Sequence, residues 1–158
     1  MKLTAQEEYG LRCMLQVARL QANGPVPISV IAQSEGIGVE YAAKLMRILR
    51  QEGLVTARRG AQGGYLLANP PDEVTVLDVL GALDKPLYTE AFCTGHAGQQ
   101  ASCVHSSTGC SIRVLWQWIG ASLQRTLKRV TLADLLGGPL PVHASLAQHP
   151  TPQTGVTG

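Results

Sequence analysis

The sequence predicts a mainly α-helical chain, in which a winged helix-turn-helix DNA-binding domain is followed by a long C-terminal dimerisation helix. Three observations predict this fold: two helical segments around a glycine turn, a basic glycine-rich hairpin behind them, and apolar residues at helical spacing after residue 110. We expect residues 1–70 to form the winged domain, and residues 71–137 to form a cysteine-containing loop and the dimerisation helices. Residues 138–158 are expected to be a disordered tail, because they contain four prolines and no Lys, Arg, Asp or Glu.

The first helix is predicted from its cap and its apolar spacing. Thr4 can cap the helix, and Glu7 and Glu8 occupy the first turn, where the helix dipole favours acids. Cys13 lies among apolar residues and is expected in the core. The predicted apolar stripe of this helix comprises Leu11, Met14, Leu15 and Ala18.

The helix-turn-helix is predicted from two further segments. A short helix is expected at residues 29–34 and a second one at residues 39–51, with the turn Gly36-Ile37-Gly38 between them. The inward-facing residues of the second helix are Ala42, Leu45, Ile48 and Leu49.

The wing is predicted at residues 54–68. Residues 54–57 and 65–68 form two short apolar strands, and the basic, glycine-rich residues 58–64 connect them. A helix fits the major groove of DNA, whereas wing arginines reach the backbone or the minor groove, where negative potential attracts them. The candidate DNA-binding residues are Glu40, Tyr41, Lys44 and Arg47 in the helix and Arg58, Arg59, Gly60 and Gln62 in the wing.

The charge distribution agrees with this interpretation. The formal net charge is only +2, but residues 1–70 contain eight Lys and Arg against five Asp and Glu, whereas residues 71–158 contain five against six. Within residues 44–59 five cations are opposed only by Glu52, a pattern compatible with a phosphate backbone. A winged helix that makes only protein contacts is the alternative.

Three cysteines in residues 93–110 form the candidate metal site. Cys93, Cys103 and Cys110 lie in a segment without helical or strand periodicity, with His96 and His105 between them. Thiolates are soft ligands that suit iron-sulfur clusters and zinc. A histidine of this segment would complete a zinc site, whereas a cluster could take its fourth ligand from elsewhere. The same spacing is also compatible with a metal-free thiol redox switch, or with cysteines that have no chemical role.

The second part of the chain is predicted to be helical on both sides of the cysteines. After Pro70-Pro71, Thr75 caps a helix at residues 76–83. Thr131 and Asp134 cap a last short helix that ends at Gly137-Gly138. Between them, a long helix has an apolar stripe of Ile112, Leu115, Trp116, Ile119, Leu123, Leu127 and Val130. Little of the chain remains to cover this stripe, so we expect it, with Trp118, to pack on a second copy.

The composition predicts a cytoplasmic protein without a membrane span. The first residues contain no apolar signal core, and no apolar run is long enough to cross a bilayer. Four cysteines in 158 residues are too few for a disulfide scaffold. In a reducing compartment, such cysteines serve metal or redox chemistry.

Catalysis is not predicted. A nucleophilic pair such as Cys103 with His105 lacks an identifiable third group that would orient the base. The glycines of residues 60–64 lie between strands and do not open a helix, unlike a phosphate-binding loop. An electron carrier would have no use for a basic wing.

Over residues 1–137, the chain resembles the IscR/NsrR-type (Rrf-two) family of iron-sulfur-dependent bacterial winged-helix transcriptional regulators. The resemblance rests on the opening MKLTAQEEYGLRCMLQVA, the segment GPVPISVIAQ, the wing GLVTARRGAQGGYLL, the three-cysteine loop and the ending VTLADLL. It implies a homodimer on a near-palindromic operator in double-stranded DNA, with the residue matching Arg59 in the minor groove. It also implies that a 2Fe-2S or 4Fe-4S cluster controls DNA binding in response to redox state, nitric oxide or iron-sulfur status.

The resemblance further implies which residues hold the cluster, namely Cys93, Cys103, Cys110 and, from the opposite subunit, Glu8. The chain departs from one branch of the family at two positions. Ala43 replaces a base-reading glutamate, so the operator need not be shared, and Arg113 replaces a histidine ligand. The second departure favours Glu8 as fourth ligand, with His105 as the alternative.

Overall fold

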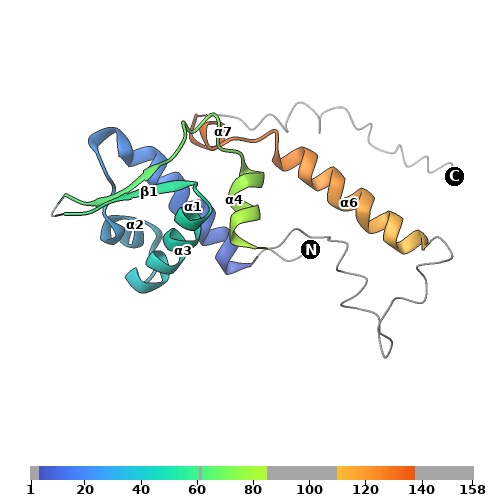
Figure 1. The fold of residues 1–158 in the computed structure, drawn as a ribbon, viewed down its shortest axis with the longest axis horizontal. Helices are drawn as coiled ribbons and strands as arrows, with labels where there is room; N and C mark the ends of the chain where they lie inside the picture. Colours follow the sequence, from blue (N-terminus) through green and yellow to red (C-terminus); the bar gives the residue numbers. More distant parts are fainter. Residues whose placement is uncertain (1–3, 61, 85–109, 138–158) are drawn as a thin grey trace, which may run out of the picture.

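The computed structural model describes residues 4–60, 62–84 and 110–137. Its elements are α1 (Ala5–Leu20), the 3-10 helix η1 (Gln21–Asn23), α2 (Ile28–Glu35), α3 (Val39–Gln51), β1 (Val55–Arg58), β2 (Gly64–Leu67), α4 (Val76–Leu83), α6 (Ser111–Leu127) and α7 (Leu132–Gly137). Figure 1 shows one body made of α1 to α4, the β-hairpin and α7, from which α6 extends. The predicted winged helix-turn-helix with a C-terminal helix is confirmed.

Helix α1 begins at the predicted cap. The Glu7 N–H donates to Thr4 Oγ1 at 3.2 Å, and the Thr4 N–H donates to the Glu7 carboxylate at 2.8 Å, which satisfies two backbone donors at the helix end. The buried face comprises Gly10, Cys13, Met14 and Val17. Of the predicted stripe, Met14 is buried but Leu11, Leu15 and Ala18 are half-buried. The buried face is therefore rotated toward Cys13, which lies in the core as predicted.

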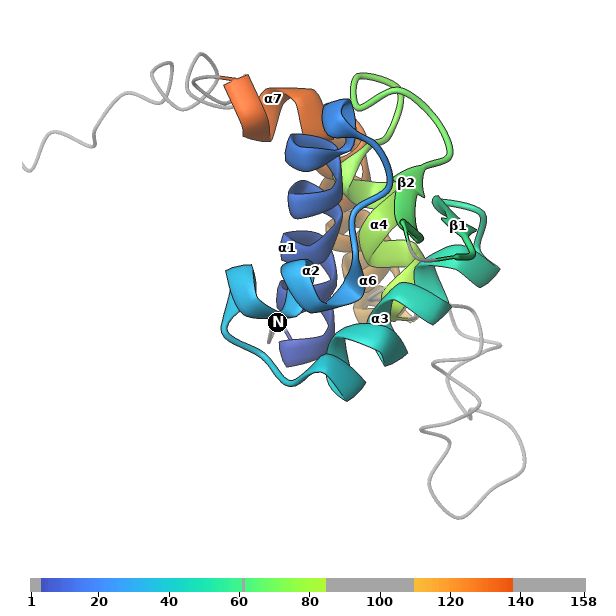
Figure 2. The ribbon, with the colours of Figure 1, turned by 90° about the vertical axis from the view of Figure 1, so that its left-hand side faces the viewer.

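Helix α1 is the central element of the body, because α2, α3, α4 and α7 all contact it (Figure 2). The contact with α4 is close at Gly10. A Cβ atom at this position would lie 2.3 Å from Leu83 Cδ1, which is well inside van der Waals contact. Glycine at position 10 thus allows the two helices to approach.

Helices α2 and α3 form the helix-turn-helix. Helix α2 ends at Glu35, and its C-terminal cap Gly36 has a φ of 64°, a left-handed conformation that glycine adopts without strain. Helix α3 has the bounds that the sequence predicts, and its buried residues are Ala42, Leu45, Met46 and Leu49. Their spacing follows one helical face. Met46 joins the predicted core residues, and Ile48 is half-buried and packs against the core.

The two strands form the wing as an antiparallel hairpin, with Val55 opposite Leu67 and Arg58 opposite Gly64. Strand β2 also bridges to the segment before α2: the N–H of each of Val26 and Tyr65 donates to the carbonyl of the other at 2.9 Å. A Cβ atom at Gly64 would lie 2.4 Å from the Val26 carbonyl oxygen. The wing is therefore attached directly to the helix-turn-helix.

The segments around α4 and α7 join the body through backbone hydrogen bonds. Thr75 caps α4 as predicted, and Asp78 completes a capping box with it. The Val76 N–H donates to the Val130 carbonyl at 2.8 Å, and the Leu132 N–H donates to the Val74 carbonyl at 2.9 Å. The chain that follows α6 thus returns to the body beside the start of α4.

The predicted cap of α7 is also present. The Thr131 N–H donates to the Asp134 carboxylate at 2.8 Å, and the Asp134 N–H donates to Thr131 Oγ1 at 3.2 Å. Hydrogen bonds from the Thr131 backbone and side chain lower the pKa of Asp134. These bonds define the point at which the chain re-enters the body.

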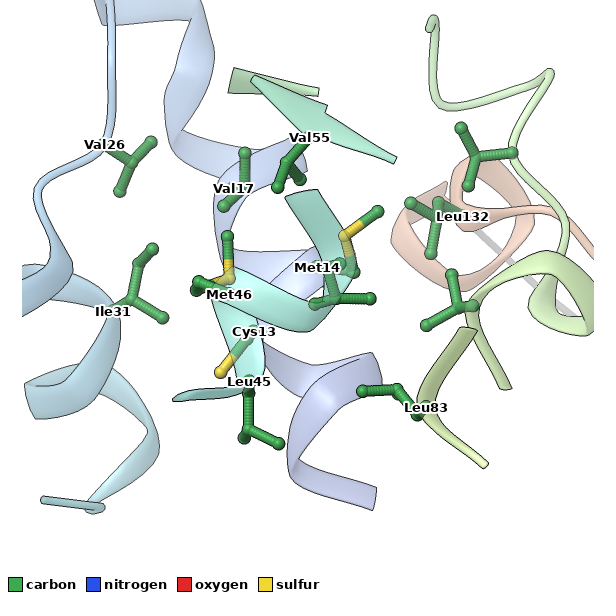
Figure 3. Close-up of a cluster of buried hydrophobic side chains, with 13 residues drawn as sticks. Cys13, Met14, Val17, Val26, Ile31, Leu45, Met46, Val55, Leu83 and Leu132 are labelled. Atoms are coloured by element: carbon green, nitrogen blue, oxygen red, sulfur yellow. The ribbon is translucent and has the colours of Figure 1, made fainter. Parts of the chain in front are cut away.

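A single hydrophobic core connects the winged helix-turn-helix with α4 and α7 (Figure 3). Met14, Leu45 and Met46 contribute from α1 and α3, whereas Leu83 and Leu132 contribute from α4 and α7. Each of these five side chains is at most 4% exposed. The core therefore extends across residue 70, where the sequence suggests a domain boundary.

Helix α6 exposes much of its apolar surface. It ends at Leu127, not at Val130 as predicted, and Val130 is buried beside α4. Ile112, Val114, Leu115, Trp116 and Trp118 are between 39% and 65% exposed. Within the described ranges, no helix is long and apolar enough to span a membrane.

We expect Gly10→Ala to lower the free energy of unfolding by about 1–3 kcal/mol, because the added methyl group must displace Leu83 in a packed core. Gly81→Ala is the matched control: this glycine is exposed in α4 and a Cβ atom there meets nothing within 4 Å. The control should raise the free energy of unfolding by about 0.5–1 kcal/mol through helix propensity. Chemical denaturation measures both, and equal shifts in the two variants would contradict the close α1–α4 contact.

Candidate nucleic-acid interface and metal ligands

Helix α3 presents a polar outer face because its apolar face is held in the core. Glu40, Lys44 and Arg47 are exposed, and Glu40 lies in the first turn. Tyr41 is half-buried, and its ring meets the Tyr9 ring edge-on at a centroid distance of 6.2 Å. Three of the four predicted helix residues thus point to solvent, whereas Tyr41 also packs on α1.

The wing presents its arginines at the end of the hairpin. Arg58, Arg59, Gly60 and Gln62 are all exposed. Gly60 has a φ of 112°, and the Gly63 N–H donates to its carbonyl at 2.9 Å, which closes the turn. Figure 1 shows that the tip extends beyond the helices at the end of the molecule away from α6.

The two surfaces together concentrate positive charge. Lys44, Arg47, Arg58 and Arg59 are exposed on α3 and the wing, and Glu40 is the acid among the candidate residues. A helix with an exposed polar face beside a basic hairpin is an arrangement that can enter a groove and contact the flanking backbone. The arrangement can therefore bind a nucleic-acid duplex.

Glu8 takes part in a network of charges on α1. The Arg12 Nε lies 2.7 Å from Glu8 Oε1, and the Arg12 Nη1 lies 3.8 Å from Glu35 Oε2. The Gln16 amide donates to the other oxygen of Glu35. The hydrogen bond and the charge of Glu8 raise the pKa of Arg12, and Glu35 and Tyr9 add to this against a desolvation effect. Arg12 thus bridges carboxylates of α1 and α2.

The predicted metal ligands are partly within the described residues. Cys110 is a free, half-buried thiol at the N-terminal cap of α6, where the helix dipole favours negative charge. The Glu8 side chain is 42% exposed. Cys93, Cys103 and His105 lie outside the described residues, as does His96. Within the described residues, no three His, Cys, Asp or Glu side chains form a group that could hold a metal ion.

Cys110 and Glu8 do not meet within one chain. The 17 residues of α6 extend over about 25 Å at the ordinary helical rise, and its first turn is the end that points away from the body (Figure 1). Glu8 lies on α1 within the body. In this arrangement, Glu8 and Cys110 of the same chain therefore lie on separate parts of the molecule.

Cys13 is not available as a ligand. Burial, and to a smaller extent the charge of Glu35, raise its pKa to about 12, so the thiolate that binds soft metals does not form at neutral pH. This agrees with its predicted place in the core.

Sequence reasoning missed Arg12, Glu35 and Tyr9. The spacing of Glu8 and Arg12 by four residues on one helix was a detectable signal for an ion pair. The pairs of Arg12 with Glu35 and of Tyr9 with Tyr41 depend on how α1 packs against α2 and α3, and local sequence patterns do not carry that information.

Comparison with known proteins identifies the family. A family model named Rrf2 and described as an iron-dependent transcriptional regulator matches residues 3–138. The protein Rrf2 of Nitratidesulfovibrio vulgaris is 37% identical over 136 residues, which cover 86% of this chain and 87% of that protein.

Solved structures show the same fold. A structure of IscR from T. potens has a TM-score of 0.67 and 28% identity, covering 96% of this chain and 93% of the other. The global cysteine regulator CymR of B. subtilis has a TM-score of 0.64 and 29% identity, covering 85% and 95%. These matches confirm the resemblance that the sequence motifs indicate. The chain therefore belongs to the Rrf2 family of DNA-binding transcriptional regulators and is not an enzyme.

Proposed function

We propose that this regulator is a homodimer whose binding to operator DNA is controlled by an iron-sulfur cluster that senses redox state, nitric oxide or iron-sulfur status. The observation that carries the proposal is the position of Cys110. It caps the first turn of α6, and this end of the exposed, apolar helix points away from the body that contains α1. Pairing of two chains through α6 would bring the cysteine of one near the body of the other.

The dimer is supported by the exposed apolar side chains of α6. Burying a large apolar side chain contributes about 1.5–3 kcal/mol, and Ile112, Val114, Leu115 and Trp118 are each more than 45% exposed. A symmetric pair of α6 helices buries every such residue twice. Helix α6 then serves as the dimerisation helix that the sequence predicts.

The proposed cluster ligands are Cys93, Cys103 and Cys110 of one subunit and Glu8 of the partner subunit, with His105 as the alternative fourth ligand. The donor set fits, because thiolates hold iron-sulfur clusters and because Glu8 has a carboxylate that is partly open to solvent. When bound, the cluster would supply a redox-reactive centre. The residues of this chain would hold it between the dimerisation helix of one subunit and the DNA-binding body of the other.

The proposed contacts to DNA follow from the two charged surfaces. Helix α3 of each subunit would enter one of two successive major grooves of a near-palindromic operator, with Glu40, Tyr41, Lys44 and Arg47 toward the DNA. The wing residues Arg58, Arg59, Gly60 and Gln62 would lie at the adjacent minor groove. All of these residues except Tyr41 are exposed.

The cluster is tested by anaerobic purification and measurement of iron, acid-labile sulfide and visible absorption. We expect both elements in the wild-type protein and an altered absorption spectrum in Glu8→Ala, because a fourth ligand is lost. Glu7→Ala is the matched control. Glu7 caps the helix and is not a proposed ligand, so this substitution should leave the spectrum unchanged. Zinc without sulfide would favour a structural zinc site, and three metal-free thiols would favour a thiol redox switch. An unchanged spectrum in Glu8→Ala would indicate that His105, and not Glu8, is the fourth ligand.

The wing is tested on a duplex that the protein selects from a random-sequence pool. Arg58→Ala and Arg59→Ala should each weaken binding and lower the slope of log K against log salt by about one, because one cation near phosphate is removed. Lys128→Ala, which removes an exposed cation just after α6, should leave affinity and slope unchanged. Equal effects of all three substitutions in a titration by fluorescence anisotropy would contradict the assignment.

The dimer interface is tested with Leu115→Asp. Two copies of this change remove two apolar contacts and place two charges in the interface, so the dimer dissociation constant should rise by at least about a hundredfold. Gln117→Asp adds the same charge on the opposite side of α6 and serves as the control, because Gln117 is exposed and polar. Analytical ultracentrifugation measures both, and an unchanged dimer in Leu115→Asp would exclude this face.

A further inference from the structure

We propose that Arg12 is a positioning residue that transmits the state of Glu8 to the helix-turn-helix. The inference rests on the proposed function, because Glu8 acts there as a cluster ligand. It goes further by naming the contact through which ligation in one part of the dimer changes the position of the DNA-reading helix in another.

The first step is the competition of two carboxylates for one guanidinium group. Arg12 holds Glu8 at 2.7 Å through Nε and approaches Glu35 to 3.8 Å through Nη1. The shorter contact is a charge-assisted hydrogen bond, whereas the longer one is only an ion pair. A Glu8 carboxylate that ligates a metal shares its charge and lone pairs with that metal. Arg12 is then free to close the distance to Glu35.

The second step is the position of Glu35. This residue is the last of α2 and immediately precedes Gly36, where the chain turns toward α3. Its side chain is only 8% exposed, and the amide of Gln16 on α1 also bonds it. A change in the Arg12–Glu35 distance therefore acts on the turn that connects α2 to α3 in the helix-turn-helix. Exposed surface side chains would absorb such a change, but a nearly buried carboxylate with a second partner cannot move independently of its helix.

The third step is a second contact from the same part of α1. Tyr9 follows Glu8 in the chain, and its ring packs edge-on against Tyr41 of α3 at 6.2 Å. Helix α1 thus contacts the end of α2 through Arg12 and the outer face of α3 through Tyr9, both within about one helical turn of Glu8. A movement of this turn when Glu8 is ligated would displace both helices together.

The test is a double-mutant cycle on the metal-free protein with the duplex that it selects from a random-sequence pool. Glu8→Gln keeps the shape of the side chain and removes its charge, as ligation would remove it from Arg12. We expect Glu8→Gln to change the DNA dissociation constant by about threefold, a modest effect because the Arg12 side chain is 54% exposed. The change should disappear in the Glu35→Gln and Arg12→Met backgrounds. The same change in all three backgrounds, or no change in the wild-type background, would overturn the proposal.

The controls separate positioning from folding. Arg19→Met removes an exposed arginine from the last turn of the same helix and should leave the effect of Glu8→Gln intact. Arg12→Lys keeps the charge but lacks the planar fork that spans two carboxylates, so it should retain part of the effect. Arg12→Lys also replaces Arg12→Met in the cycle if circular dichroism shows that Arg12→Met does not fold.

The loaded protein distinguishes this proposal from the cluster itself. Arg12→Met should contain the same iron and sulfide as wild type, with an unchanged visible spectrum, but its DNA affinity should no longer differ between the loaded and metal-free forms. A wild-type protein without sulfide would exclude the proposed cluster, and the metal-free cycle would still decide the role of Arg12. A normal cluster, together with additive effects of the substitutions in the double-mutant cycle, would exclude the role of Arg12 and leave the proposed cluster unaffected.

Discussion

The burial of one face of α1 is the packing interaction on which the rest of the molecule depends. Met14 and Val17 are fully buried in the core that α2, α3, α4 and α7 share, and Gly10 allows α4 to approach closely. Helix α3, the wing and the segment that follows α6 are therefore all positioned relative to one helix. The same helix carries Glu8 on its solvent side, so a ligand at Glu8 would act on the element that organises the body.

The fold was largely predictable because its local signals agree with its tertiary structure. The predicted caps at Thr4, Thr75 and Thr131 are all present, the last with its predicted partner Asp134, and the bounds of α3 follow from its hydrophobic periodicity. The differences arise where packing decides. The buried face of α1 is rotated because Gly10 and Cys13 meet α4 and the core, and Val130 leaves the stripe of α6 because a backbone hydrogen bond ties it to Val76.

The candidate site was predictable in its residue types but not in its connections. The residues on the outer face of α3 and in the wing follow from helical spacing and from the glycine-rich turn. The ion pair of Arg12 with Glu35 joins residues on two different helices. Tyr41 is half-buried, and its ring contacts Tyr9 of another helix. Such contacts are set by the crossing of α1 over the helix-turn-helix, which no single segment encodes.

The bridge between Val26 and Tyr65 has a consequence for the operators that this regulator can read. Because β2 is hydrogen-bonded to the segment before α2, the wing is attached to the helix-turn-helix that carries α3. In the proposed complex, the separation between the major-groove contact and the minor-groove contact would then be the same in every half-site. Variation among operators is expected in the spacer between half-sites, because the proposed dimer would join its two subunits through α6, whereas insertions inside a half-site should not be tolerated.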